Sequence, residues 1–246
     1  MNVLLRKTSL VDYPEKIASV IFFAACNLRC PWCHNRELVL SCGEEVGRGG
    51  WVSLDQALAH IRKRRSMLGG VVLSGGEPTL YTKLTELIVS IKDFGLPVKL
   101  DTNGMNPSVL ETLLRKAPPD YIALDLKLAP DRYAELFPPS HTAGAASAEQ
   151  VGLALKQSAA LIRDSVLTHE FRTLALPNVD ETDIDALAPL VDEALWSFRA
   201  FSSGNCLDPI WNTFADSSMA DVNKLVKRAR ELGKNAVGGN FGGEGN

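Results

Sequence analysis

Six short apolar runs alternate with helical stretches along this chain of 246 residues, and this alternation constrains the fold more than any other feature. The apolar runs are residues 17–25, 70–74, 97–101, 121–125, 169–175 and 196–201. Helices are expected to begin near the cap-type residues Ser147, Asp180 and Ser218, and after a capping box formed by Ser53 and Gln56, with an end near Ser66. Strands that alternate with helices favour a parallel sheet. We therefore expect an α/β fold, a partial (open) β/α barrel of about six parallel strands, with functional residues on the loops after the strands.

Composition places the chain among ordinary globular proteins, with 46% hydrophobic and 22% charged residues and a net charge of -3. We expect one core domain over residues 1–237 and a flexible glycine-rich tail over 238–246. The chain has no long apolar run, which argues against membrane insertion, and its slight acidity argues against a nucleic-acid partner. Five cysteines imply no disulfide framework. Together these features predict a cytoplasmic protein.

Three of the cysteines, Cys26, Cys30 and Cys33, lie in one short loop directly after the first apolar run. Thiolates are the usual protein ligands of iron-sulfur clusters, and three of them leave one iron of a [4Fe-4S] cluster open for another ligand. A structural zinc site is the alternative, but it normally takes four Cys or His ligands, and only Cys42 or His34 stands close enough in the sequence to complete the set. The loop therefore favours a cluster over zinc.

Polar residues also follow the later apolar runs. Gly75 and Gly76 would let the backbone approach a ligand closely, with Glu77 placed to receive an ammonium group, although the same residues suit an ordinary turn. Asp125 and Lys127 are two apart on a strand and point to one side, so they either pair with each other or jointly bind a charged group.

Two further positions extend this set of polar residues. Asp101 and Thr102 end the third apolar run, and Arg172 stands within the fifth. An arginine in an apolar strand needs a carboxylate, a phosphate or a position at the edge of the sheet to satisfy its donors. We expect these side chains to lie at the same edge of the sheet as the cysteine loop.

The combination of Cys-x3-Cys-x2-Cys after the first strand with Gly-Gly-Glu-Pro after the second resembles the radical S-adenosylmethionine (radical SAM) superfamily. Within it, the segments 8–14, 33–35, 99–104 and 125–127 resemble activases of glycyl radical enzymes. The segments 170–173 and 204–209 resemble the branch of anaerobic ribonucleoside-triphosphate reductase activating proteins. The resemblance covers nearly the whole chain and implies a partial barrel of the radical SAM type.

This resemblance implies an oxidoreductase whose organic chemistry is carried by its cofactors, a [4Fe-4S] cluster and S-adenosylmethionine, with a monovalent cation beside them. Cleavage of S-adenosylmethionine would create a radical that removes hydrogen from a glycine of a partner enzyme, most simply anaerobic ribonucleotide reductase. A small electron-donor protein such as flavodoxin or ferredoxin would supply the electron. Partner specificity would reside in surface loops such as 41–50 and 138–147.

Residue roles follow from matching motifs. The iron ligands would be Cys26, Cys30 and Cys33, and the cofactor-binding residues would be Trp32, Gly75, Gly76, Glu77, Asp101, Thr102, Asp125, Lys127 and Arg172. Trp32 would pack near the adenine, although a core tryptophan is an equal alternative. No catalytic residue is assigned, since segment 201–204 lacks the histidine that formate-lyase activases place there, and Cys42 and Cys206 have no assigned role.

Three alternative functions remain open from the sequence. The first is an activase of pyruvate formate-lyase or of another glycyl radical enzyme. The second is a radical SAM enzyme that acts on a small molecule, as relatives that make modified purines do. The third is a zinc-binding module without enzymatic activity.

Overall fold

Residues 1–40, 50–137 and 148–239 are described in the computed structural model, and their contacts divide into two units. The first unit comprises residues 1–27, 35–102 and 108–122, and the second comprises 28–34, 103–107 and 123–246. Strand β6 (Tyr121–Asp125) begins in the first unit and ends in the second.

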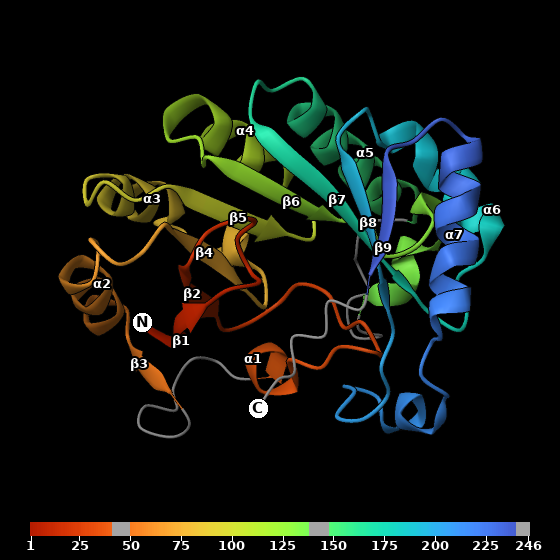
Figure 1. Ribbon diagram of the computed structural model, residues 1–246, viewed down its shortest axis with the longest axis horizontal. Coiled ribbons are helices and arrows are strands. Elements are labelled where there is room, and N and C mark those ends of the chain that lie inside the picture. Colours follow the sequence, from red (N-terminus) through yellow and green to blue (C-terminus); the bar gives the residue numbers. More distant parts are fainter. Residues whose placement is uncertain (41–49, 138–147, 240–246) are drawn as a thin grey trace. The chain divides into compact units, whose positions relative to one another are not determined.

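In the first unit the strands lie in the order β3-β1-β2-β4-β5 (Figure 1). Their bounds are β1 (Asn2–Ser9), β2 (Ala18–Phe23), β3 (Trp51–Ser53), β4 (Gly70–Gly75) and β5 (Val98–Thr102). Strand β1 pairs antiparallel with both β2 and β3, whereas β2, β4 and β5 are parallel. The helices of this unit are α1 (Arg36–Leu40), α2 (Leu54–Lys63), α3 (Leu84–Lys92), most of α4 (Pro107–Lys116) and the 3-10 turn η1 (Pro78–Leu80).

In the second unit the strands lie in the order β6-β7-β8-β9, and β7 (Thr168–Ala175), β8 (Leu195–Ala200) and β9 (Ala236–Gly239) are parallel. The helices are α5 (Ala148–Arg163), α6 (Glu181–Leu187) and α7 (Met219–Glu231), with 3-10 segments η2 (Pro130–Leu136), η4 (Ala188–Leu190) and η5 (Pro209–Thr213). Figure 1 shows α7 running alongside β9.

The expected open α/β architecture with a mostly parallel sheet is confirmed, and all six predicted strands are present. The capping box of Ser53 and Gln56 also forms, as does side-chain capping by Asp180 and Ser218. Helix α2 ends at Lys63 rather than near Ser66, because Arg64 leaves helical geometry. Strands β1, β3 and β9 were not predicted.

Two residues of the predicted glycine-rich tail lie in strand β9. Gly238 and Gly239 pair with Phe198 and Arg199 of β8 and so belong to the sheet. A Cβ atom on Gly238 would lie 2.7 Å from Val222, so glycine is what lets β9 approach α7 this closely. Residues 240–246 lie outside the described part of the chain.

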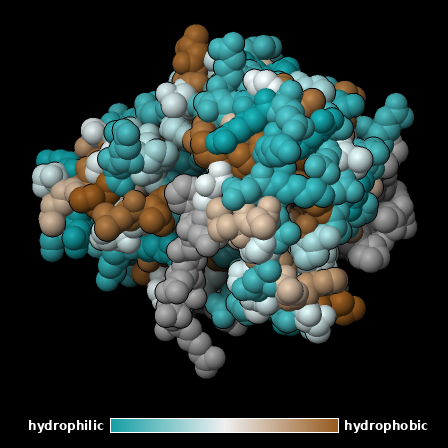
Figure 2. All heavy atoms as spheres, turned by 45° about the vertical axis from the view of Figure 1, so that its right-hand side comes forward, coloured by the Kyte–Doolittle hydropathy of each residue, from teal (hydrophilic) through white to brown (hydrophobic). Residues whose placement is uncertain are grey.

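The core consists of strand residues and the helix faces that cover them, with Ile21, Leu73 and Leu100 fully buried in the first unit and Phe171 and Trp196 in the second. Figure 2 shows one face on which hydrophilic residues predominate and hydrophobic ones form small separate patches. None of the helices within residues 1–40, 50–137 and 148–239 combines the length and the apolar character needed to cross a bilayer.

Candidate functional site

In the first unit, the turn after β4 is hydrogen-bonded to the end of β2 and to the residues that follow it. The amide of Gly76 donates to the carbonyl of Phe23, and the amide of Glu77 donates to the carbonyl of Ala25, both at 2.9 Å. A Cβ atom on Gly76 would lie 1.8 Å from the Ala25 oxygen, and Gly75 has a φ of 116°. These two glycines therefore let the turn approach the chain that leads into Cys26, which is a more specific reason for glycine than an ordinary turn.

Glu77 is buried, at 1% exposed, and its Oε1 atom accepts hydrogen bonds from three donors. These donors are the amide of Thr79 at 3.1 Å, the hydroxyl of Thr79 at 2.6 Å and the hydroxyl of Thr102 at 2.8 Å. The carboxylate thus caps η1 and ties it to the end of β5. Two of the predicted cofactor residues, Glu77 and Thr102, are in direct contact.

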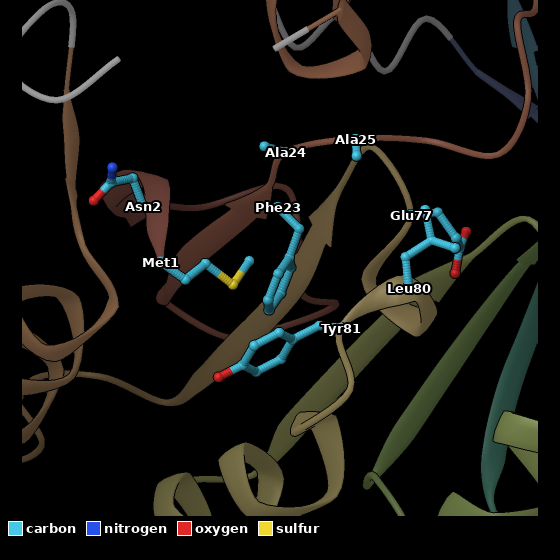
Figure 3. A pocket seen from close by; sticks show the side chains of 8 residues that line it. All are labelled: Met1, Asn2, Phe23, Ala24, Ala25, Glu77, Leu80 and Tyr81. Atoms are coloured by element: carbon cyan, nitrogen blue, oxygen red, sulfur yellow. The ribbon is translucent and has the colours of Figure 1, made fainter. Parts of the chain in front are cut away.

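A pocket of about 320 Å³ adjoins this turn and is lined by Met1, Asn2, Phe23, Ala24, Ala25, Glu77, Leu80 and Tyr81 (Figure 3). The rings of Phe23 and Tyr81 pack next to each other, with centroids 5.5 Å apart, while the Glu77 carboxylate points away from the Phe23 ring. The pocket is mainly apolar and offers few polar groups to orient a ligand.

Asp101 on β5 is paired with Lys99, a partner that the sequence analysis did not assign. The Lys99 ammonium contacts Asp101 at 2.5 Å, is only 2% exposed and lies 5.7 Å from the centre of the Tyr121 ring. A buried lysine needs such a counter-charge. The spacing of Lys99 and Asp101, two apart on one strand, was the signal that could have revealed the pair, because such residues point to the same side.

In the second unit, the carboxylate of Asp125 binds two cations. Its Oδ1 accepts from Nε of Arg172 at 2.8 Å, and its Oδ2 accepts from Nζ of Lys127 at 3.0 Å. The prediction left open whether Asp125 and Lys127 pair or act on a ligand, and they do pair, with Arg172 as a third member. The three side chains carry one net positive charge and remain partly exposed, so the group suits an anionic ligand.

The charges of Asp125, Arg172 and Lys127 shift the pKa values of Asp125 and Lys127 towards their ionised forms. Burial opposes ionisation of Asp125, but the cations of Arg172 and Lys127 outweigh it and hold the pKa of the carboxyl well below its usual range. Burial likewise opposes the charge on Lys127, yet Asp125 and then Cys30 raise the pKa of this ammonium group. Lys127 therefore stays positive and interacts electrostatically with Cys30, one of the predicted iron ligands.

Tyr133 forms hydrogen bonds with the backbone of Asp125 and Lys127, and the sequence analysis did not predict this role. The residue is fully buried, its hydroxyl accepts from the amide of Lys127 at 2.8 Å, and it donates to the carbonyl of Asp125 at 3.1 Å. Burial raises the pKa of this hydroxyl, so it remains a donor at neutral pH. Nothing in the local pattern around Tyr133 distinguishes it from a core tyrosine.

The three predicted iron ligands are divided between the units. Cys26 belongs to the first unit, while Cys30 and Cys33 belong to the second. Cys30 is 7% exposed, the amide of Cys33 donates to its carbonyl at 3.0 Å, and Cys26 and Cys33 are half-buried. Trp32, between the last two ligands, is 6% exposed and packs against Trp211 at 5.1 Å.

The described residues hold no group of three Cys, His, Asp or Glu side chains arranged around a single metal ion. In a four-iron cluster, each cysteine thiolate binds a different iron, so the three thiols need not surround one metal ion.

His34 was considered as a zinc ligand, but its Nε2 atom lies 2.7 Å from the carbonyl of Ser202. Burial and then the neighbouring Cys33 raise the pKa of the buried Cys206 thiol. Cys42 lies outside the described residues.

The sequence pattern of the Radical SAM superfamily matches residues 20–188. The chain belongs to this superfamily. Membership implies a [4Fe-4S] cluster and S-adenosylmethionine as cofactors, and the observed donors fit them: three thiols on one short loop, a cation beside Cys30 and a cationic group around Asp125.

Two of the proteins that the chain resembles are named as activating enzymes. A Methanocaldococcus jannaschii protein with the provisional name glycyl-radical enzyme activating enzyme is 34% identical over 229 residues, which is 92% of this chain and 87% of that protein. The pyruvate formate-lyase-activating enzyme of Clostridium pasteurianum is 31% identical over 127 residues, which is 50% of each chain.

Two solved structures resemble the fold of this chain. Streptococcus suis SuiB bound to S-adenosylmethionine has a TM-score of 0.59 and 16% identity, over 89% of this chain and 51% of SuiB. TYW1 with a lysine-pyruvate adduct has a TM-score of 0.57 and 14% identity, over 87% of this chain and 73% of TYW1. At these identities the likeness supports the fold alone.

Proposed function

We propose that this chain is a radical SAM activase that generates a glycyl radical on a partner enzyme. The observation that carries the proposal is the similarity to the Methanocaldococcus jannaschii relative, which extends over most of both chains and is not confined to the cysteine loop. When bound, the cluster and S-adenosylmethionine supply the radical chemistry. The chain itself has to bind these groups, orient them and exclude water.

The residues of the second unit would hold the anionic end of S-adenosylmethionine. Arg172 and Lys127 share one carboxylate, that of Asp125, so the group retains a positive charge for the methionyl carboxylate. In the first unit, Gly75, Gly76 and Glu77 would face the methionyl amino group. Asp101 and Thr102, at the end of β5, would belong to the site of the monovalent cation and the cofactor. Trp32 would contact the adenine.

The first partner to test is anaerobic ribonucleotide reductase, because segments 170–173 and 204–209 resemble the activating proteins of that enzyme. Pyruvate formate-lyase is the second candidate, supported by the Clostridium pasteurianum relative. A small flavodoxin or ferredoxin would deliver the electron in the cytoplasm. The loops 41–50 and 138–147 are expected to select the partner, and residues 41–49 and 138–147 lie outside the described residues.

The test is activation of each candidate enzyme under anaerobic conditions. The reconstituted and reduced protein is mixed with S-adenosylmethionine and either enzyme, and the glycyl radical is recorded by electron paramagnetic resonance while 5'-deoxyadenosine is assayed. Cys30→Ala should abolish both signals, and Cys42→Ala is the matched thiol control. A radical on one enzyme identifies the partner. Cleavage of S-adenosylmethionine without a radical on either enzyme would contradict the proposed partners, and a wild type with an intact cluster but no cleavage would contradict the activity.

A further inference from the structure

Residues 201–217, which connect β8 to α7 in the second unit, fold against the segment that carries Cys30 and Cys33. We call residues 201–217 the clasp. The amide of Asp208 donates to the carbonyl of Pro31 at 2.9 Å, and the side-chain amide of Asn205 donates to the carbonyl of His34 at 3.3 Å. The clasp therefore binds the backbone on both sides of Cys33.

Aromatic packing adds to these hydrogen bonds, and Trp211 is its centre. Its ring lies 5.1 Å from Trp32 with an interplanar angle of 51°, 5.7 Å from Phe201 at 83° and 5.2 Å from Phe214 at 58°. Trp32 and Phe201 are buried, at 6% and 2% exposed. Tilted and edge-on contacts at these distances are the favourable arrangements for aromatic pairs. One face of Trp32 is thus held by a residue nearly 180 positions away in the sequence.

The clasp has its own internal supports. The amide of Ser217 donates to the carbonyl of Phe201 at 2.9 Å, which joins the two ends of the segment. The carboxylate of Asp216 accepts from the amide of Ser203 at 2.6 Å, and the side chain of Asn212 accepts from the amide of Cys206 at 2.8 Å. The clasp is consequently a formed structure that can position Trp211 on η5.

We propose that Trp211 is a positioning residue for the cysteine loop. Trp32 stands between Cys30 and Cys33, so an orientation imposed on its ring is passed to the backbone that spaces these two thiols. Iron ligands must be held in a defined arrangement by residues that are themselves locked by packing. The interaction of Trp211 with Trp32, and the hydrogen bonds of the clasp to Pro31 and His34, supply that support. This inference rests on the cofactors of the superfamily and is independent of the partner enzyme.

The first measurement uses the protein without its cluster. Two indole rings at 5.1 Å and 51° should give an exciton couplet in the far-ultraviolet circular dichroism spectrum. Trp32→Phe and Trp211→Phe should each remove the couplet, and Trp51→Phe in the first unit, which lies outside the clasp, should retain it. Retention of the couplet in either of the first two variants would overturn the proposed contact.

The second measurement uses the reconstituted protein and a double-mutant cycle. Trp211→Ala should weaken binding of S-adenosylmethionine about fivefold, and Trp32→Ala at least as much, because it also removes the proposed adenine contact. The double variant should be no weaker than Trp32→Ala, because the effect of Trp211 is exerted through Trp32. Trp211→Ala should also alter the electron paramagnetic resonance spectrum of the reduced cluster, which a purely structural role would leave unchanged. Trp211→Phe, which keeps an aromatic ring, should recover most of the affinity.

Additive effects in this cycle, or an affinity within twofold of wild type in Trp211→Ala, would overturn the proposal. If Trp211→Ala does not fold, Asn205→Ala provides a milder variant, because it removes one hydrogen bond between the clasp and His34. Asn205 has a φ of 60°, so alanine there should lower the melting temperature slightly, but the variant should still fold and shift the same spectrum. An unchanged spectrum would count against the proposal. None of these measurements depends on a glycyl radical. Failure of the activase proposal can therefore be distinguished from failure of the proposed role of Trp211.

Discussion

The hydroxyl of Thr102 donates a hydrogen bond of 2.8 Å to Oε1 of the buried Glu77, so the end of β5 and the turn after β4 share one carboxylate. Both residues were expected to bind a cofactor, and their contact gives them a structural role as well. A buried carboxylate that loses a donor is penalised, because water cannot replace the missing hydrogen bond.

Thr102→Val should therefore lower the free energy of unfolding by ~1–3 kcal/mol, since the isosteric valine leaves Glu77 with one donor fewer. Chemical denaturation followed by circular dichroism measures the loss. Thr102→Ser keeps the hydroxyl and should recover most of the stability. Equal stability of the valine variant and the wild type would show that this hydrogen bond contributes nothing.

Gly76→Ala should disrupt the turn after β4, because the new Cβ atom would stand 1.8 Å from the carbonyl oxygen of Ala25. Relief of that overlap has to move the backbone next to Cys26, and we expect a destabilisation above ~3 kcal/mol, together with loss of cluster binding. The melting temperature and the iron content after reconstitution are the measurements.

Gly95→Ala is the matched control for this substitution. Gly95 has a φ of 79°, but a Cβ atom there meets nothing within 4 Å, so only the ~1–2 kcal/mol of a left-handed alanine is expected. Iron binding should remain intact in this variant. Similar losses in both variants would mean that the close approach of Gly76 to Ala25 does not make glycine necessary there.

Asp125 should make stability depend on acid pH. Its pKa is depressed in the folded protein, so its contribution is present above the unfolded value of about 4 and is lost as the pH falls below it. Asp125→Asn should lower the unfolding free energy by ~1–2 kcal/mol at neutral pH, and the difference from wild type should shrink on acidification. Denaturation at several pH values measures this, with Asp93→Asn at an exposed position as the control. A difference that does not vary with pH would contradict the assignment.

Tyr13 should make stability depend on alkaline pH. Burial, with a smaller effect from Asp120, raises the pKa of this phenol to about 12. Because the folded value lies above the unfolded value of about 10, the contribution to stability is complete below pH 10 and is lost as the pH rises towards 12. Burial also raises the pKa values of Tyr81 and Tyr133, so spectrophotometric titration should show several late-ionising tyrosines, and Tyr13→Phe should remove one of them. Ionisation of every tyrosine near pH 10 would contradict this prediction.

The sequence determined the elements whose signals are local. Apolar runs identified six strands within one or two residues, and side-chain caps identified the helix starts at Ser53, Asp180 and Ser218. The cysteine spacing identified the superfamily that residues 20–188 match. Each of these signals is contained in a short stretch of chain, so it can be seen without knowing what packs against it.

The tertiary structure decided whatever depends on distant segments. Strands β1 and β3 are short or mixed in polarity and form by pairing, and β9 is glycine-rich and depends on β8 and α7. The contact of Trp32 with Trp211 belongs to the same class, because it joins residues far apart in the chain. Local patterns reflect the preferences of neighbouring residues, whereas these contacts exist only after the backbone has folded, so no spacing in the sequence could reveal them.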